Sequence, residues 1–137
     1  MLPEEKITTF TTICVVLLRE LRSEKGLHQA QVADWMGKSQ SAWTKVESGK
    51  SPIQFEAFVR VCSFMHVMPS AVLATAERYA ALLGQSGWVV LYGELEEGSD
   101  ALMKSAQEYW SSPACRNIQP RSWGYVSILN TPSYEFN

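Results

Sequence analysis

The chain has 137 residues, of which 46% are hydrophobic and 19% charged, and its formal net charge is -2. This length suits one domain or two small ones, and the apolar fraction excludes wholesale disorder. The longest uninterrupted apolar run, residues 13–18, is far shorter than the roughly 20 residues that a membrane-spanning helix needs. The first ten residues carry acids where a secretory signal carries lysines. We therefore expect a soluble, cytoplasmic protein that does not bind membranes.

Charge and cysteine content narrow the classes of partner and site. Residues 1–70 carry a net charge of +1 and residues 71–137 a net charge of -3. The overall pI of about 5.7 argues against binding that coats nucleic acid without sequence preference, but it is compatible with a small basic face. Cys14, Cys62 and Cys115 are far apart and have no neighbouring Cys or His, so they indicate neither disulfides nor zinc. Because the sequence contains no catalytic or metal-binding signature, we expect no enzyme activity, cofactor or metal.

Apolar periodicity predicts a mainly helical first half. The first predicted helix, about residues 4–25, is apolar on two faces. One face serves its own domain, and the other, with Phe10, Ile13 and Leu17, needs a second domain or a second chain. Further helices are predicted over about residues 29–36, 40–48, 54–65 and 69–84.

The pattern then changes to strand, helix, strand. Residues 87–93 (GWVVLYG) and 122–130 (SWGYVSILN) have the apolar, aromatic and β-branched character of strands. A helix with one apolar face is predicted over about residues 100–110, with Ser99 as its cap. These elements form a small α+β region over residues 85–137.

The most informative pattern lies between Leu27 and Pro52. The sequence LHQAQVADWMGKSQSAWTKVESGKSP predicts two short helices separated by a turn centred on glycine. Ala33 is small where the second helix crosses closely over the first, and Gly37 can adopt the left-handed conformation that reverses the chain. This is the pattern of a helix-turn-helix. The inner faces are expected to bury Val32, Met36, Trp43 and Val46.

The longer segment LRELRSEKGLHQAQVADWMGKSQSAWTKVESGKSP, within about residues 14–73, resembles the Xre/Cro class of helix-turn-helix domains, the lambdoid phage repressor type. The LRxLRxxxGL start, the small residue before the turn glycine, the SQS opening of helix three and the ExGK exit agree in register. The resemblance implies a five-helix, lambda-repressor-like domain within residues 1–84, in a prokaryotic or phage protein that regulates transcription. Its third helix would lie in the major groove of double-stranded DNA.

The resemblance also implies roles for individual residues. The Gln40 amide has the donor and acceptor that match an adenine edge, with Ser39 as the helix cap. Gln29 would touch phosphate and face Gln40, and Arg22 and Glu47 would form a structural ion pair between helices one and three. The expected base contacts are Gln40, Ser41, Thr44 and Lys45, and the expected phosphate contacts are Gln29, Lys38 and Lys50.

Three positions depart from the family pattern, and the first is Lys38, which replaces a commonly apolar or small residue before the cap of helix three. Trp43 stands where the family usually has Ile or Val, which predicts repacking or partial exposure of this large side chain. His28 stands at the usual Ser or Thr cap of helix two, which predicts a weaker start for that helix.

The region after residue 84 carries more aromatic surface than two strands and a helix can bury. We therefore expect it to form a homodimer, with the strands joined into one four-stranded sheet. The alternative is that the same aromatic side chains form a pocket that binds a small-molecule effector. The predicted function is a homodimeric repressor on a palindromic operator, with recognition helices about 34 Å apart. The alternatives are an antitoxin that represses its own operon and binds a toxin through this region, and a protein-interaction module without DNA binding. The candidate dimer residues are Phe10, Ile13, Leu17, Trp88, Val90, Trp123 and Tyr125.

Overall fold

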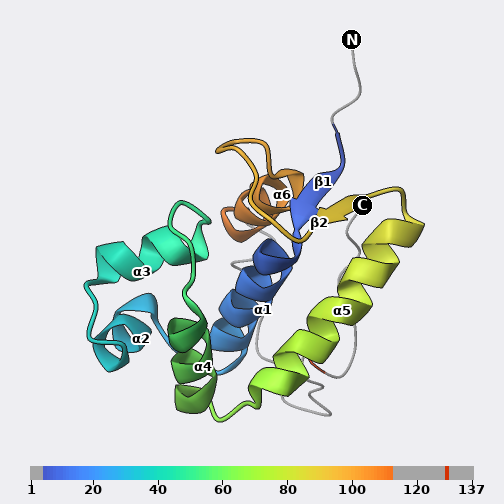
Figure 1. Cartoon of the computed structure of the whole chain (residues 1–137). Helices are drawn as coiled ribbons and strands as arrows, with labels where there is room; N and C mark the ends of the chain where they lie inside the picture. The colour runs from blue at the N-terminus through green and yellow to red at the C-terminus, as the bar shows by residue number, and fades with distance from the viewer. Residues whose placement is uncertain (1–4, 113–128, 130–137) are drawn as a thin grey trace.

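The structure is a computed structural model, and it describes residues 5–112 and residue 129. Helix α1 runs through the middle of the molecule, with α2 and α3 toward one side and α5 on the other (Figure 1). This mainly helical architecture with a small sheet confirms the predicted fold class. In chain order the elements are β1 (Ile7–Thr9), α1 (Phe10–Glu24), α2 (Gln29–Trp35), α3 (Gln40–Glu47), α4 (Phe55–Phe64), α5 (Pro69–Gln85), β2 (Val89–Leu91) and α6 (Ala101–Trp110).

The first helix starts later than its apolar pattern predicts. Residues Ile7–Thr9 form strand β1, and α1 begins at Phe10. These three residues are β-branched and favour extended backbone. Thr9 then caps the helix, because its hydroxyl oxygen accepts a hydrogen bond of 3.0 Å from the Thr12 amide. The predicted start at residue 4 is therefore wrong for residues 7–9.

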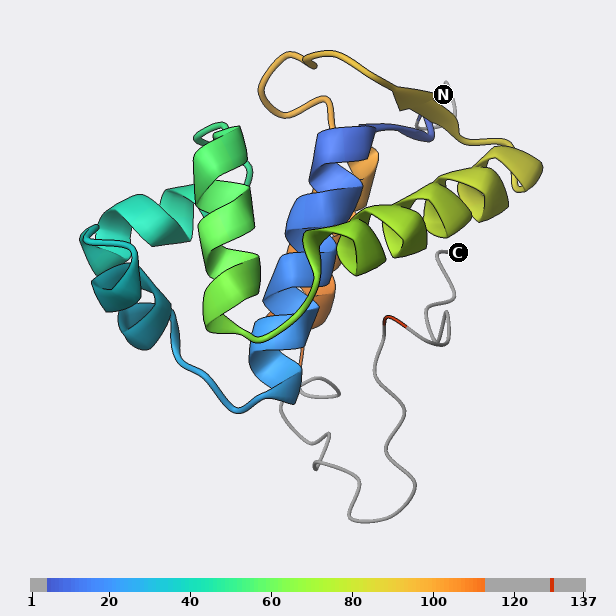
Figure 2. The same ribbon diagram turned by 60° about the horizontal axis from the view of Figure 1, so that its bottom comes forward.

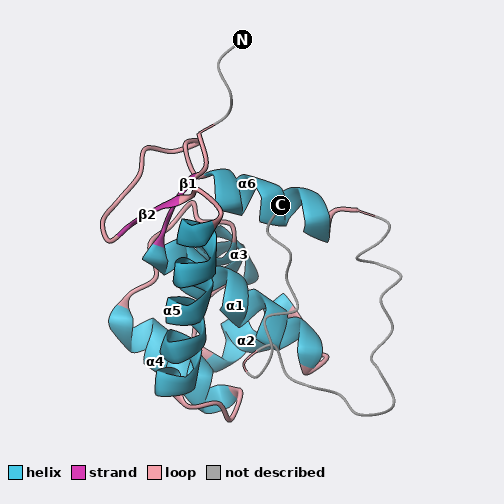
Figure 3. Ribbon diagram, turned by 90° about the vertical axis from the view of Figure 1, so that its right-hand side faces the viewer, coloured by secondary structure: helices cyan, strands magenta, loops and turns pink. Residues whose placement is uncertain are grey.

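Strand β2 finds its partner at the other end of the chain. It pairs in parallel with β1, with Thr8 opposite Val90. The two strands lie together beside α6 (Figure 3). The expectation had been pairing with residues 122–130 or with a second copy. Apart from residue 129, that predicted strand lies outside the described residues, as do Trp123 and Tyr125.

Helix α6 covers a face of α1 that carries Val15 and Val16, which differs from the second apolar face predicted from Phe10, Ile13 and Leu17. It packs on α1 and β1 (Figure 2), and Val15, Val16 and Met103 form a small cluster between the two helices. Ile13 and Leu17 belong to the main core and are each 1% exposed within a single chain. The prediction that these two side chains form a dimer interface is therefore wrong, because this chain's own helices already bury them.

The start of α6 is tied to the start of α1 by a single carboxylate. Asp100, not the predicted Ser99, caps α6 by accepting a hydrogen bond of 3.0 Å from the Met103 amide. The same carboxylate accepts hydrogen bonds from the hydroxyls of Thr8, at 2.8 Å, and Thr12, at 2.5 Å. These three bonds fix the beginning of α6 against β1 and the first turn of α1.

Within the described part of the chain, no single helix is long and apolar enough to cross a membrane. Helices α4 and α5 pass that test only as a pair, and they are bent by 110° relative to each other. Both contribute buried side chains to the main core, including Phe58, Cys62, Ala76 and Tyr79.

Candidate nucleic-acid interface

The turn between α2 and α3 has the geometry that its sequence predicts. Gly37 has a φ of 68°, in the left-handed region where a side chain is strained. The Lys38 amide donates a hydrogen bond of 2.9 Å to the Ala33 carbonyl, which closes the end of α2. Ala33 itself is 2% exposed. A larger residue at position 33 would push the two helices apart, so this turn fixes the angle at which α3 leaves α2.

Helix α3 buries one face and exposes the other. Its start is capped by Ser39, whose hydroxyl oxygen accepts a hydrogen bond of 3.1 Å from the Ala42 amide. The buried side consists of Trp43, Val46 and Glu47. The outer side is polar and accessible to a ligand along both turns of the helix. Its exposed residues are Gln40, Ser41, Thr44 and Lys45.

Positive charge borders this outer face at both ends. Lys38 precedes the helix, Lys50 follows it, and both side chains are exposed. A cavity of about 340 Å³ opens beside α3, and it is lined by Lys38, Ser41 and Lys45 on one side and by residues 51–54 on the other. The combination of hydroxyls and ammonium groups favours an anionic ligand at this surface.

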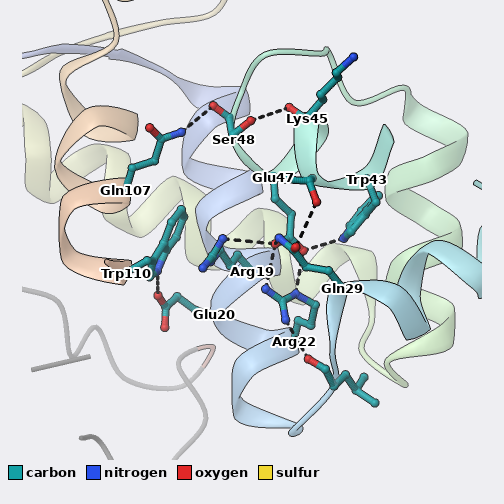
Figure 4. Close-up of polar contacts among 12 residues, drawn as sticks. Arg19, Glu20, Arg22, Gln29, Trp43, Lys45, Glu47, Ser48, Gln107 and Trp110 are labelled. Atoms are coloured by element: carbon teal, nitrogen blue, oxygen red, sulfur yellow. Dashed lines mark hydrogen bonds and ion pairs between the residues drawn. The ribbon is translucent and has the colours of Figure 1, made fainter. Parts of the chain in front are cut away.

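The inner side of α3 is anchored by one buried carboxylate, that of Glu47, which is 1% exposed (Figure 4). Arg22 on α1 forms the expected ion pair and donates two hydrogen bonds, Nε at 2.8 Å and Nη2 at 2.9 Å. Arg19 on the same helix lies 3.6 Å away. These charges compensate a carboxylate that would otherwise be costly to bury. Arg19 escaped the sequence analysis, although its spacing of three residues from Arg22 places both on one face of the helix.

Trp43 is fully packed, at 1% exposed, so the predicted partial exposure is wrong. Its indole Nε1 donates a hydrogen bond of 2.6 Å to the Glu47 carboxylate. A buried tryptophan needs such a partner for its N–H. The carboxylate one turn along the helix supplies that partner, and the large ring fills the space between α3 and the core.

Gln29 does not show the predicted pairing with Gln40. Its side-chain Nε2 donates a hydrogen bond of 3.0 Å to Glu47, and its Oε1 accepts one of 3.1 Å from the Thr44 hydroxyl. The buried carboxylate is a stronger acceptor than a neutral amide on the surface, which explains the preference. Thr44 is thereby connected through Gln29 to the ion pair beneath the helix, and Gln40 stays exposed at the leading end.

The start of α2 is stronger than His28 alone predicts. The Gln31 side chain reaches back, and its Oε1 accepts a hydrogen bond of 2.8 Å from the His28 amide. This contact satisfies one of the N–H groups that a helix start leaves without a partner.

Comparison with known families found a match for this part of the chain. Residues 15–76 match a family described as a helix-turn-helix domain. The match begins within α1, includes α2, the turn and α3, and ends within α5. Such a domain suggests a DNA-binding regulator, and its family is typically non-enzymatic. No curated protein and no solved structure matches the chain.

Proposed function

We propose that the protein is a sequence-specific transcriptional regulator of the Xre/Cro type, which places α3 in the major groove of duplex DNA and represses by occupying an operator. One observation carries the proposal. The helix that follows the turn exposes a continuous face of Gln40, Ser41, Thr44 and Lys45, and its other face is locked to the core through Glu47. A rigid helix with a polar outer face is what base recognition in the major groove requires.

The outer side chains have distinct chemistries for base edges. The Gln40 amide carries both a donor and an acceptor, the pair that matches N7 and the exocyclic amine of adenine. Lys45 offers donors to the O6 and N7 of guanine. The Thr44 hydroxyl donates to Gln29 Oε1, and the same side chain carries a methyl group of the kind that contacts a thymine methyl.

Phosphate contacts complete the proposed interface. Lys38 and Lys50 are exposed at the two ends of α3, where they would neutralise the backbone on either side of the groove. Gln29 is half-buried at the start of α2, where its Nε2 donates to Glu47 and its Oε1 accepts from Thr44, so its phosphate contact would use the second N–H of the side-chain amide.

We also propose that the protein acts as a homodimer. Helix α3 has eight residues and spans few base pairs, so a long operator requires two copies with recognition helices about 34 Å apart. Apolar side chains beside β2 support an additional contact surface: Val89 is 52% exposed, and Tyr92, which stacks on Phe10, is 81% exposed. Sedimentation at micromolar concentration tests this, and a monomer would refute it.

Selection of bound fragments from random DNA tests the function directly, with dyad symmetry in the selected site as the expected result. Gln40→Ala is expected to cost about 1–3 kcal/mol on the selected operator and little on random DNA. Lys50→Ala is expected to weaken both alike and to lower the salt slope by about 1. Gln85→Ala, at the exposed end of α5, is the matched control and should change neither. Unchanged operator affinity of the Gln40→Ala protein would refute the proposed role of α3.

A further inference from the structure

Helix α6 lies outside the matched domain, and one of its faces contacts the C-terminal end of the proposed recognition helix α3. Met103, Gln107 and Trp110 follow one another at spacings of four and three residues, so they share one side of α6. That side faces α1 and the segment from Glu47 to Gly49, where α3 ends (Figure 4).

The closest link is a hydrogen bond to the backbone. The Gln107 side-chain Nε2 donates 3.1 Å to the carbonyl oxygen of Ser48, the residue that caps α3 at its C-terminus. The last carbonyl groups of a helix have no partner within the helix. Gln107 supplies one of them with a donor from an element about 60 residues further along the chain.

The next residue of the exit turn is in direct contact with α6. Gly49 has a φ of 77°, and a Cβ built at this position would lie only 3.2 Å from Met103 Cε. A side chain at position 49 would therefore require Met103 to move by a few tenths of an ångström. Three backbone hydrogen bonds shape the same turn, from the amides of Gly49, Lys50 and Ser51 to carbonyls of Val46 and Lys45.

A third link runs through α1. The Arg19 guanidinium lies 4.0 Å from the ring centroid of Trp110 and 3.6 Å from the Glu47 carboxylate. The Trp110 indole donates a hydrogen bond to Glu20 at 2.5 Å, which fixes the ring beneath the arginine. Trp110 thus holds Arg19, and Arg19 faces the carboxylate on which the inner side of α3 rests.

We infer that α6 positions the recognition helix for DNA, with Gln107 as the main positioning residue. This inference rests on the proposed function. Gln107 touches no proposed DNA contact, but it holds the turn that carries Lys50 and ends the helix that carries Gln40 and Lys45. Asp100 at the start of α6 bonds to Thr12 and Trp110 at its end bonds to Glu20, so both ends of α6 are attached to α1.

Gln107→Met in the full-length protein tests the inference, because methionine keeps the length and helix propensity of glutamine but has no donor. We expect amide hydrogen exchange to accelerate at residues 48–51 and to stay unchanged in α5. Operator affinity should fall about 2- to 10-fold, the range that corresponds to one lost hydrogen bond. The ratio of operator to random-DNA affinity should fall with it, an effect that uniform destabilisation of the fold does not produce.

Ser105→Ala, at an exposed position of the same helix, is the matched control and should leave exchange and both affinities unchanged. Faster exchange with unchanged operator affinity, or no change in either, would overturn the inference while wild-type binding still supports the proposed function. If the wild-type protein selects no DNA sequence, the proposed function itself fails, and the inference fails with it.

Discussion

The buried Glu47 carboxylate gives the sharpest test of how this domain is held together. In the Glu47→Gln protein the side chain keeps its size but loses its charge and one of its two acceptor oxygens. Arg22, Gln29 and Trp43 all donate to this carboxylate, at 2.6 to 3.0 Å. A glutamine offers a single acceptor oxygen, so the donors that lose the second oxygen face the NH2 group of the glutamine, which cannot accept a hydrogen bond from them. The Arg22 guanidinium, 11% exposed, is then left without its counter-charge.

Breaking a buried ion pair by removing one partner costs about 3–5 kcal/mol. This is a large share of the about 5–15 kcal/mol that stabilises a typical domain. For a chain of this size, about 3–4 °C of melting temperature corresponds to each kcal/mol, so we expect a fall of about 10–20 °C.

Urea and thermal unfolding followed by circular dichroism measure this effect. Glu77→Gln, at an exposed position of α5, is the control and should stay within about 0.5 kcal/mol of wild type. Arg22→Met combined with Glu47→Met removes both charges and should be less harmful than the sum of the two single changes, because no unpaired charge remains buried. A loss below about 1 kcal/mol for Glu47→Gln would refute the reasoning, since it would mean that the charge of the carboxylate contributes little to the free energy of unfolding.

Three further predictions concern local features. Ser39→Ala should cost about 1 kcal/mol through loss of the α3 cap, and Ser39→Gly only a few tenths, as measured by urea unfolding. Gly37→Ala should cost about 1–2 kcal/mol because its φ is 68°, although nothing lies within 4 Å of the added Cβ; an equally stable variant would contradict the strain argument. Burial raises the pKa of the Cys14 and Cys62 thiols from 9.0 to about 11. In a Cys115→Ser background, both thiols should therefore react slowly with a disulfide reagent at pH 8. The free energy of unfolding should fall as the pH rises from 9 to 11, and it should fall less steeply in the Cys14→Ala protein.

The helix-turn-helix itself could be predicted from sequence because its determinants are local. A glycine that must be left-handed, a serine that caps and a small residue at a helix crossing each act within a few residues of their own position. The exposure of Gln40 and Lys45 follows from the same helical period that buries Val46. Periodicity also placed α4, α5 and α6 within a few residues of their observed ends.

Only the tertiary structure decided the contacts between distant parts of the chain. β1 became a strand because β2, eighty residues later, offers it a partner, and α6 covers the face of α1 that carries Val15 and Val16. Gln29 turned from Gln40 to the buried Glu47, and Trp43 became fully buried, for one reason. A buried carboxylate must form hydrogen bonds with donors from the protein in place of water. Which donors lie close enough depends on how the helices pack, and no local pattern of residues encodes that packing.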